Sequence, residues 1–216
     1  MKRLIRYFGP YLGLILAAIA LLYGQANCDL ALPDYMSRIV NVGIQQGGVE
    51  GAVPEALSPA TMDRLGLFLD ETLAARVAAD YELALPGSEL YKAKAGRYPA
   101  APAEGLYILR KIDKAERAAI EPSLAKAFLG LAAIEKLAAD PRAATALGMP
   151  SLPEGSDLFA LLKQLPPAQR QALGARMDSR TASLGPSMTI QAAAQEIKAE
   201  YLALGIDEGA LQTAYI

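Results

Sequence analysis

The 216-residue chain contains no histidine, no tryptophan and a single cysteine, Cys28. Without histidine there is no imidazole to complete a Cys–His zinc site, to activate a cysteine nucleophile or to act as the base of a Ser–His–Asp triad. One cysteine forms no disulfide within its own chain. The sequence therefore excludes these catalytic and metal sites, and we expect no metal, no cofactor and no catalytic residue in this chain.

The chain also has no large excess of charge of one sign, because its 21 Lys+Arg residues nearly balance its 23 Asp+Glu residues. A nucleic-acid-binding protein takes much of its affinity from clustered cations, so we expect no nucleic-acid partner. The 53% content of hydrophobic residues is too high for a mostly disordered chain. Alanine and leucine dominate, and we predict an all-α fold.

A long uncharged run follows the basic residues Lys2, Arg3 and Arg6, and the next charge is Asp29. Residues 11–31 span roughly 32 Å as a helix, which matches the hydrocarbon core of about 30 Å. The sequence predicts a transmembrane helix here, in contact with membrane lipid. Because the cations precede it, the positive-inside rule places the N-terminus in the cytoplasm and the residues after the helix outside.

Three other interpretations of this run stay open. A cleaved signal peptide would need small residues at its cleavage site, and Gln25-Ala26-Asn27 fits that poorly. A lipoprotein anchor at Cys28 is disfavoured in the same way, because Asn27 stands where a small residue is wanted. A buried helix of a soluble protein is disfavoured by the unbroken length of the run.

Polar residues near the outer end of the run are the candidate functional residues. Gln25 and Asp29 lie four residues apart and so share a helix face, which suits a bundle interior or a water-filled cavity. Wetting at the membrane boundary is the alternative for both. Pro33 removes one backbone donor and can bend the helix, which apolar spacing extends to about Ile44, before Gly47-Gly48. A stripe of small residues would let another helix approach closely: Gly13, Ala17, Ala20, Gly24 and Cys28.

The two ends of the chain resemble those of a known transporter family. Several segments are similar to the start of ABC exporters of the fused permease–ATPase, multidrug type: MKRLIRYFGPYLG, then Leu32-Pro33, Ile39-Val40-Asn41 and Gly43-Ile44, and NVGIQQGGVEGAVPE over residues 41–55. Residues 196–216 (EIKAEYLALGIDEGALQTAYI) resemble the return from a large extracytoplasmic insert into the second transmembrane helix of that family. The middle matches only in length and general character.

This resemblance implies the domain organisation and the localisation. Residues 1–10 would be a cytoplasmic elbow helix, 11–46 the first transmembrane helix with an extracytoplasmic extension, 47–206 a helical extracytoplasmic insert, and 207–216 the start of a second transmembrane helix. The protein would lie in a bacterial plasma membrane. By resemblance, Gln25, Asp29 and Pro33 are the candidates for pore-lining or hinge roles.

The ATPase of that family has no counterpart here. No Gly-x-x-x-x-Gly-Lys-Ser/Thr loop occurs, and no glycine is followed by lysine. We therefore expect a fragment or a truncated gene product that is not itself an enzyme. ATP and Mg would be bound only by the full-length family protein. Its further partners would be the remaining transmembrane helices, the ATPase domain and a second exporter half, identical or different.

Two other functions are kept as hypotheses. A single-pass, membrane-anchored helical binding module would show one span and an independent folded domain. A secreted or lipidated enzyme would need cleavage before Cys28. Ser123 and Lys126 match the Ser-x-x-Lys motif of penicillin-interacting enzymes, but the Ser-Asp-Asn and Lys-Thr-Gly motifs are missing, so we read them as surface neighbours.

Helix signals recur through the middle of the chain. Capping residues and breakers predict helices over residues 58–69, 70–84, 88–95, 113–139, 157–165, 168–180 and 187–204. Loops are expected over residues 96–105 and around Pro141, Pro150 and Pro153, and residues 106–110 form an apolar run compatible with a strand. Four tyrosines are expected to pack in the core rather than line a ligand surface: Tyr81, Tyr91, Tyr98 and Tyr107.

Overall fold

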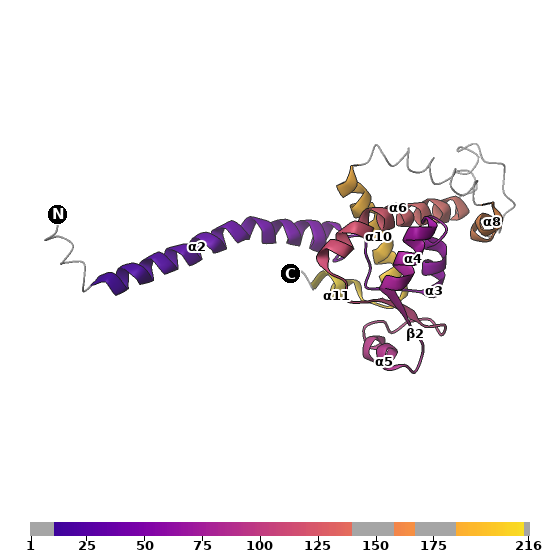
Figure 1. Cartoon of the computed structure of the whole chain (residues 1–216), viewed down its shortest axis with the longest axis horizontal. Helices are drawn as coiled ribbons and strands as arrows, with labels where there is room; N and C mark the ends of the chain where they lie inside the picture. Colours follow the sequence, from indigo (N-terminus) through magenta and orange to yellow (C-terminus); the bar gives the residue numbers. More distant parts are fainter. Residues whose placement is uncertain (1–10, 140–157, 167–184, 214–216) are drawn as a thin grey trace.

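The computed structural model describes residues 11–139, 158–166 and 185–213. The expected elbow over residues 1–10, the helix over 168–180 and the loop around Pro141, Pro150 and Pro153 lie outside these ranges. Figure 1 shows one long helix, α2 (Leu12–Arg38), which projects from a folded domain that starts near Val49 and includes Leu211.

Helix α2 continues without a break into the π-helical turn η2 (Ile39–Gln45). Together they form a 34-residue helix, the one helix in the described ranges long and apolar enough to cross a membrane. None of the α2 residues is buried, and leucines such as Leu14 and Leu21 are exposed. A helix apolar on all sides is unfavourable in water and needs lipid or other helices around it. Gly47 (φ 63°) and Gly48 (φ 87°) end it, as predicted.

The folded domain is mostly helical but contains a small antiparallel sheet. Its strands are β1 (Ala56–Leu57), β2 (Tyr81–Ala84) and β3 (Leu106–Leu109), in the order β1-β3-β2. The predicted, mostly helical character is confirmed, and this small sheet is the part of the fold that the all-α prediction does not include. The strand suggested within residues 106–110 is confirmed.

The helix predicted over residues 70–84 is also partly wrong. Helix α4 (Glu71–Asp80) ends before Tyr81, and the last four residues of the prediction form β2. Strand β2 pairs with β3 from Tyr81↔Leu109 to Ala84↔Leu106. Tyr81 and Ala84 are thereby buried. Pairing with a distant strand overrides the local helix preference here.

The shorter helices begin at the side chains that the sequence marks as caps. Ser58 caps α3 (Pro59–Leu65), Asp70 caps α4, and Ser88 caps α5 (Glu89–Ala95). Asp113 and Glu116 form a reciprocal capping box at the start of α6 (Lys114–Ala139), which continues through Pro122. The remaining described helices are α8 (Leu158–Gln164), α10 (Pro186–Ala203) and α11 (Glu208–Thr213).

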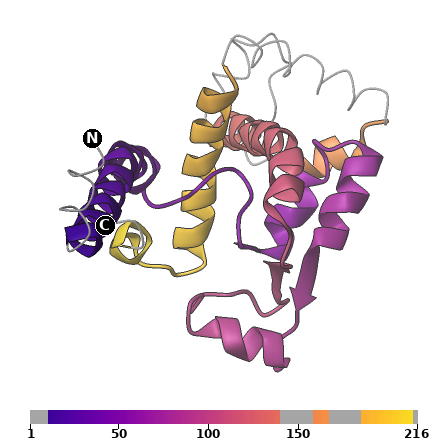
Figure 2. The same ribbon diagram turned by 60° about the vertical axis from the view of Figure 1, so that its left-hand side comes forward.

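The core forms where α6 and α10 pack against each other and against the sheet (Figure 2). Small residues allow the close approach, since Ala125 on α6 and Ala193 and Ala194 on α10 are fully buried. At Gly130 a β-carbon would lie 2.7 Å from the ring of Phe68, so only glycine fits there without movement. Tyr81 and Tyr98 are buried in this core, while Tyr91 and Tyr107 pack against it half-buried, as expected.

Candidate functional site

Gln25, Asp29 and Pro33 all lie on the exposed surface of α2. Gln25 and Asp29 are one helical turn apart, and neither forms a hydrogen bond or ion pair with another described residue. No described element of the folded domain therefore bonds to these side chains. Their pore-lining or hinge role stays a prediction, because it requires contacts with other transmembrane helices, and the described residues include one candidate span alone.

The best-defined site is the junction between the long helix and the folded domain. We call residues 46–58, which lead from η2 to α3, the junction segment. It contains little regular structure, yet most of it is buried, including Val49, Val53 and Leu57. A buried backbone needs hydrogen-bond partners for its N–H and C=O groups. Here side chains from three different elements supply them.

Helix α6 supplies two of these side chains. Glu121 accepts a hydrogen bond from the backbone N–H of Ala52 (2.9 Å), and Arg117 donates to the carbonyl oxygen of Val53 (2.6 Å). Gly51 has a φ of 77°, and a β-carbon there would lie 2.1 Å from the carboxylate oxygen of Glu121. Glycine is therefore required both for the left-handed backbone and for the space that Glu121 fills.

Helix α10 and strand β2 hold the rest of the junction segment. The hydroxyl of Tyr201 accepts from the N–H of Glu55 (2.7 Å), and the hydroxyl of Tyr81 donates to the carbonyl of Pro54 (2.7 Å). One oxygen of Glu200 accepts from the N–H of Ser58 and the other from the hydroxyl of Thr61, both at 2.8 Å. The core helices thus fix the segment from both sides.

The last two helices of the domain, α10 and α11, contact the end of the long helix at η2. Gln191 donates to the side chain of Gln45 (3.1 Å), and Gln195 donates to the carbonyl of Gln45 (2.8 Å), which attaches α10 to η2. Arg38 pairs with Glu50 across the junction (3.1 Å). Helix α11 lies beside η2, as Figure 2 shows, so the chain enters and leaves the domain side by side.

The turn between α10 and α11 is also held by several contacts. Gly205 has a φ of 86°, the left-handed conformation predicted for a residue after a helix end. Asp207 accepts from the N–H of Ala210 (3.2 Å) and caps α11. Lys198 on α10 forms an ion pair with Glu208, and Leu211 is buried in the main core. The orientation of α11 is therefore fixed by the same core that fixes the junction segment.

Burial changes the electrostatics of the tyrosines at this site. Burial, more than any neighbouring charge, raises the pKa of Tyr98 to about 12. Burial also raises the pKa values of Tyr81 and Tyr201 well above their ordinary range. The neighbouring Tyr201 raises the pKa of Tyr81 further, and Tyr98 does the same for Tyr201. The three phenols are thus neutral at physiological pH, and those of Tyr81 and Tyr201 hold the junction segment by hydrogen bonds.

The contacts at the junction attach the long helix to the core of the folded domain. Among the described residues there is no group of three or more His, Cys, Asp or Glu side chains that would hold a metal ion. Ser123 and Lys126 lie one turn apart on α6, with Lys126 exposed at the surface. Sequence reasoning missed Arg117, Glu121 and Glu200, because their partners are far away along the chain.

Replacing Glu200 with alanine tests the coupling. The change leaves the N–H of Ser58 and the hydroxyl of Thr61 without their acceptor. We expect a loss of about 3 kcal/mol of unfolding free energy and a fall in the melting temperature of roughly 6–12 °C. Circular dichroism of the full chain in detergent measures this. Glu89→Ala on exposed α5 is the matched control and should change stability by under about 0.5 kcal/mol. Equal shifts in the two variants would refute the role of Glu200.

We compared the chain with known protein families, curated proteins and solved structures. No protein-family model, no curated protein and no solved structure matches the chain. The functional interpretation therefore rests on the residues and contacts described above.

Proposed function

We propose that this chain is the N-terminal part of the transmembrane subunit of an ATP-driven ABC exporter for lipophilic, multidrug or peptide substrates. The observation that carries the proposal is the position of α11 beside η2, at the point where the long helix meets the domain. In this proposal the domain is an extracytoplasmic insert between the first and second transmembrane helices.

An insert between consecutive membrane helices has a strict geometric requirement. Packed helices lie about 8–10 Å apart, so the chain must leave the membrane and return to it at neighbouring points. The buried Leu211 and the Lys198–Glu208 ion pair hold α11 beside η2, which supports this arrangement. A single-pass anchored module has no such requirement, because its C-terminal end can lie anywhere on the domain.

The exposed surface of α2 also supports the proposal. Its small-residue stripe includes Gly13 and Gly24, where a β-carbon would meet nothing within 4 Å in this structure. In the proposed exporter, other transmembrane helices cover this surface, and Gln25 and Asp29 face the bundle or its cavity. The N-terminus is cytoplasmic and residues 47–206 are extracytoplasmic.

In the proposed exporter, ATP hydrolysis takes place outside this chain. This chain has no phosphate-binding loop, so ATP and Mg bind to the ATPase domain of the full-length protein. A second exporter half, identical or different, completes the pore. The part contributed by this chain is one pore helix and a cap that the junction segment fixes to that helix.

Transport by the full-length protein tests the proposal. We expect Gln25→Ala and Asp29→Ala to change the cellular resistance to at least one member of a panel of lipophilic drugs. Asn27→Ala is the matched control, because Asn27 lies on another face of α2 and its side chain bonds to the carbonyl of Tyr23 (2.8 Å). If the full-length protein confers no ATP-dependent export of any drug or peptide tested, the proposal is wrong.

A further inference from the structure

A hollow of about 250 Å³ lies between α5, the end of β3 and the start of α6. Ile108 and Ile112 form part of its wall. Its charged lining is mostly cationic: Lys94, Arg110, Lys111 and Arg117 face one acidic residue, Glu55. These five residues come from four separate parts of the chain, and the fold brings them together.

The single carboxylate of the hollow is already paired. Glu55 forms an ion pair with Arg97, which is not part of the lining (3.2 Å). Among the lining cations, Arg110 is partly neutralised by Glu82 at 3.6 Å. The next carboxylates along the chain, those of Asp113 and Glu116, are engaged in the capping box of α6.

Three of the lining cations have no carboxylate within ion-pair distance among the described residues. Lys94 and Lys111 form no ion pair with any described residue. Arg117 donates to the neutral carbonyl of Val53, which fixes its guanidinium without cancelling its charge. Cations gathered around a hollow repel one another, and a bound anion relieves that repulsion. The hollow is large enough for a small anion but smaller than a typical pocket for a drug-sized ligand.

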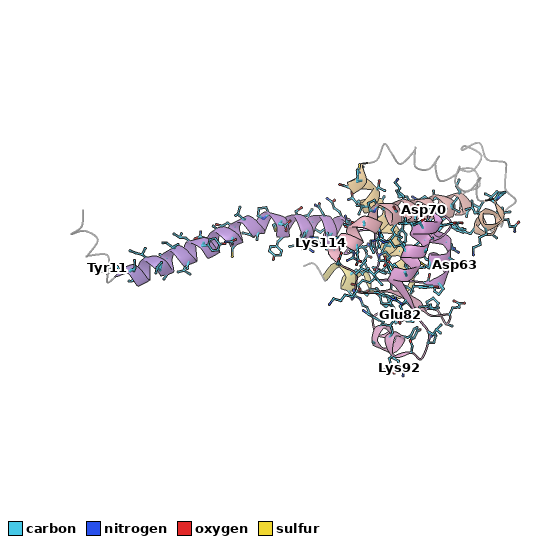
Figure 3. The ribbon with its side chains drawn as sticks, viewed as in Figure 1. Tyr11, Asp63, Asp70, Glu82, Lys92 and Lys114 are labelled. Atoms are coloured by element: carbon cyan, nitrogen blue, oxygen red, sulfur yellow. The ribbon has the colours of Figure 1, made fainter. Side chains whose placement is uncertain are left out.

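We propose that this hollow binds an anion that carries phosphate or carboxylate groups. A planar guanidinium and two mobile ammonium groups are the donors that recognise such oxygens. The anion is either free in solution or the headgroup of an acidic lipid. The hollow lies between α5, on which Figure 3 labels Lys92, and the start of α6, on which it labels Lys114. This inference goes beyond the proposed export function and does not rest on it.

The test uses the full chain in nanodiscs of neutral phosphatidylcholine, with inorganic phosphate as the probe, measured by calorimetry at low ionic strength. Lys94→Gln with Lys111→Gln should weaken phosphate binding by at least about tenfold. The matched control, Lys92→Gln with Lys163→Gln, removes the same charge outside the hollow. We expect it to change the affinity by less than about twofold.

A second arm distinguishes the two sources of the anion. Nanodiscs that contain phosphatidylglycerol, without free phosphate, are compared with neutral ones by hydrogen exchange over residues 106–112. Protection in the acidic nanodiscs identifies a lipid headgroup, and phosphate binding in neutral nanodiscs alone identifies a free anion. The proposal is overturned if phosphate does not bind and acidic lipid gives no protection. It is equally overturned if the control pair weakens binding as much as the Lys94 and Lys111 pair.

Discussion

Replacing Leu21 with arginine should remove the chain from the membrane-integrated fraction. Leu21 is the middle residue of the apolar run 11–31 and is exposed on α2. At the centre of a span, exchanging leucine for arginine costs about 3–4 kcal/mol of insertion free energy. That cost corresponds to a more than about 100-fold shift away from insertion. Carbonate extraction of membranes, followed by blotting of pellet and supernatant, measures it.

A second arginine variant controls for the added charge. Leu12 lies at the first turn of α2, from which an arginine side chain reaches the interface and costs little. Leu12→Arg should therefore stay integrated. A cysteine added at exposed Ala103, in a Cys28→Ala background, reports on which side of the membrane the folded domain lies. We expect a membrane-impermeant maleimide to label this cysteine in intact cells. If Leu21→Arg remains as well integrated as Leu12→Arg, α2 does not span the membrane.

Alkali should unfold the domain steeply. Burial holds the pKa of Tyr98 at about 12 and those of Tyr81 and Tyr201 higher, while an unfolded tyrosine titrates near pH 10. Between these values the unfolded chain loses protons that the folded chain keeps. The stability associated with the neutral phenols is therefore complete below about pH 10 and lost as pH rises above it.

The expected size of this effect is large. Each such tyrosine contributes a slope of up to about 1.4 kcal/mol per pH unit, and three give about 4 kcal/mol per unit. A domain with about 5–10 kcal/mol of stability, the lower part of the typical range, should then unfold between about pH 11 and 13. Circular dichroism and phenolate absorbance, followed together against pH, measure unfolding and ionisation in the same sample.

Two phenylalanine variants sharpen this prediction. Tyr98→Phe removes one of the three phenols, and its hydroxyl makes no hydrogen bond with a described residue, so the alkaline midpoint should rise. Tyr107→Phe removes a hydroxyl from a half-buried position outside this group and should leave the midpoint where it is. Complete ionisation of the tyrosines near pH 10 with the fold intact would contradict the argument.

The features that the sequence predicts well are local ones. The caps at Ser58, Asp70 and Ser88 depend on atoms within three residues, and the structure confirms all three. The end of the long helix at Gly47-Gly48 is equally local. Strand β2 was missed because its partner is β3, and a helical pattern gives no signal of a pairing with a distant segment.

The junction shows why the candidate site was only partly predictable. Glu121 and Ala52 are 69 residues apart, and Tyr201 and Glu55 are 146 apart. No spacing rule connects such pairs, because only the fold brings them together. Gln25, Asp29 and Pro33, by contrast, stand out in the sequence as polar residues and a proline near an apolar run, but no described residue forms a hydrogen bond or ion pair with the side chains of Gln25 and Asp29.

The most direct test of the central claim is to read the coding sequence beyond the codon for Ile216. The claim is that the domain is an insert between two membrane helices of an exporter. It predicts an apolar stretch of about 20 residues directly after α11, four further spans and a Gly-x-x-x-x-Gly-Lys-Ser/Thr loop. A stop codon within a few residues would contradict it, and the chain would then be a single-pass anchored binding module.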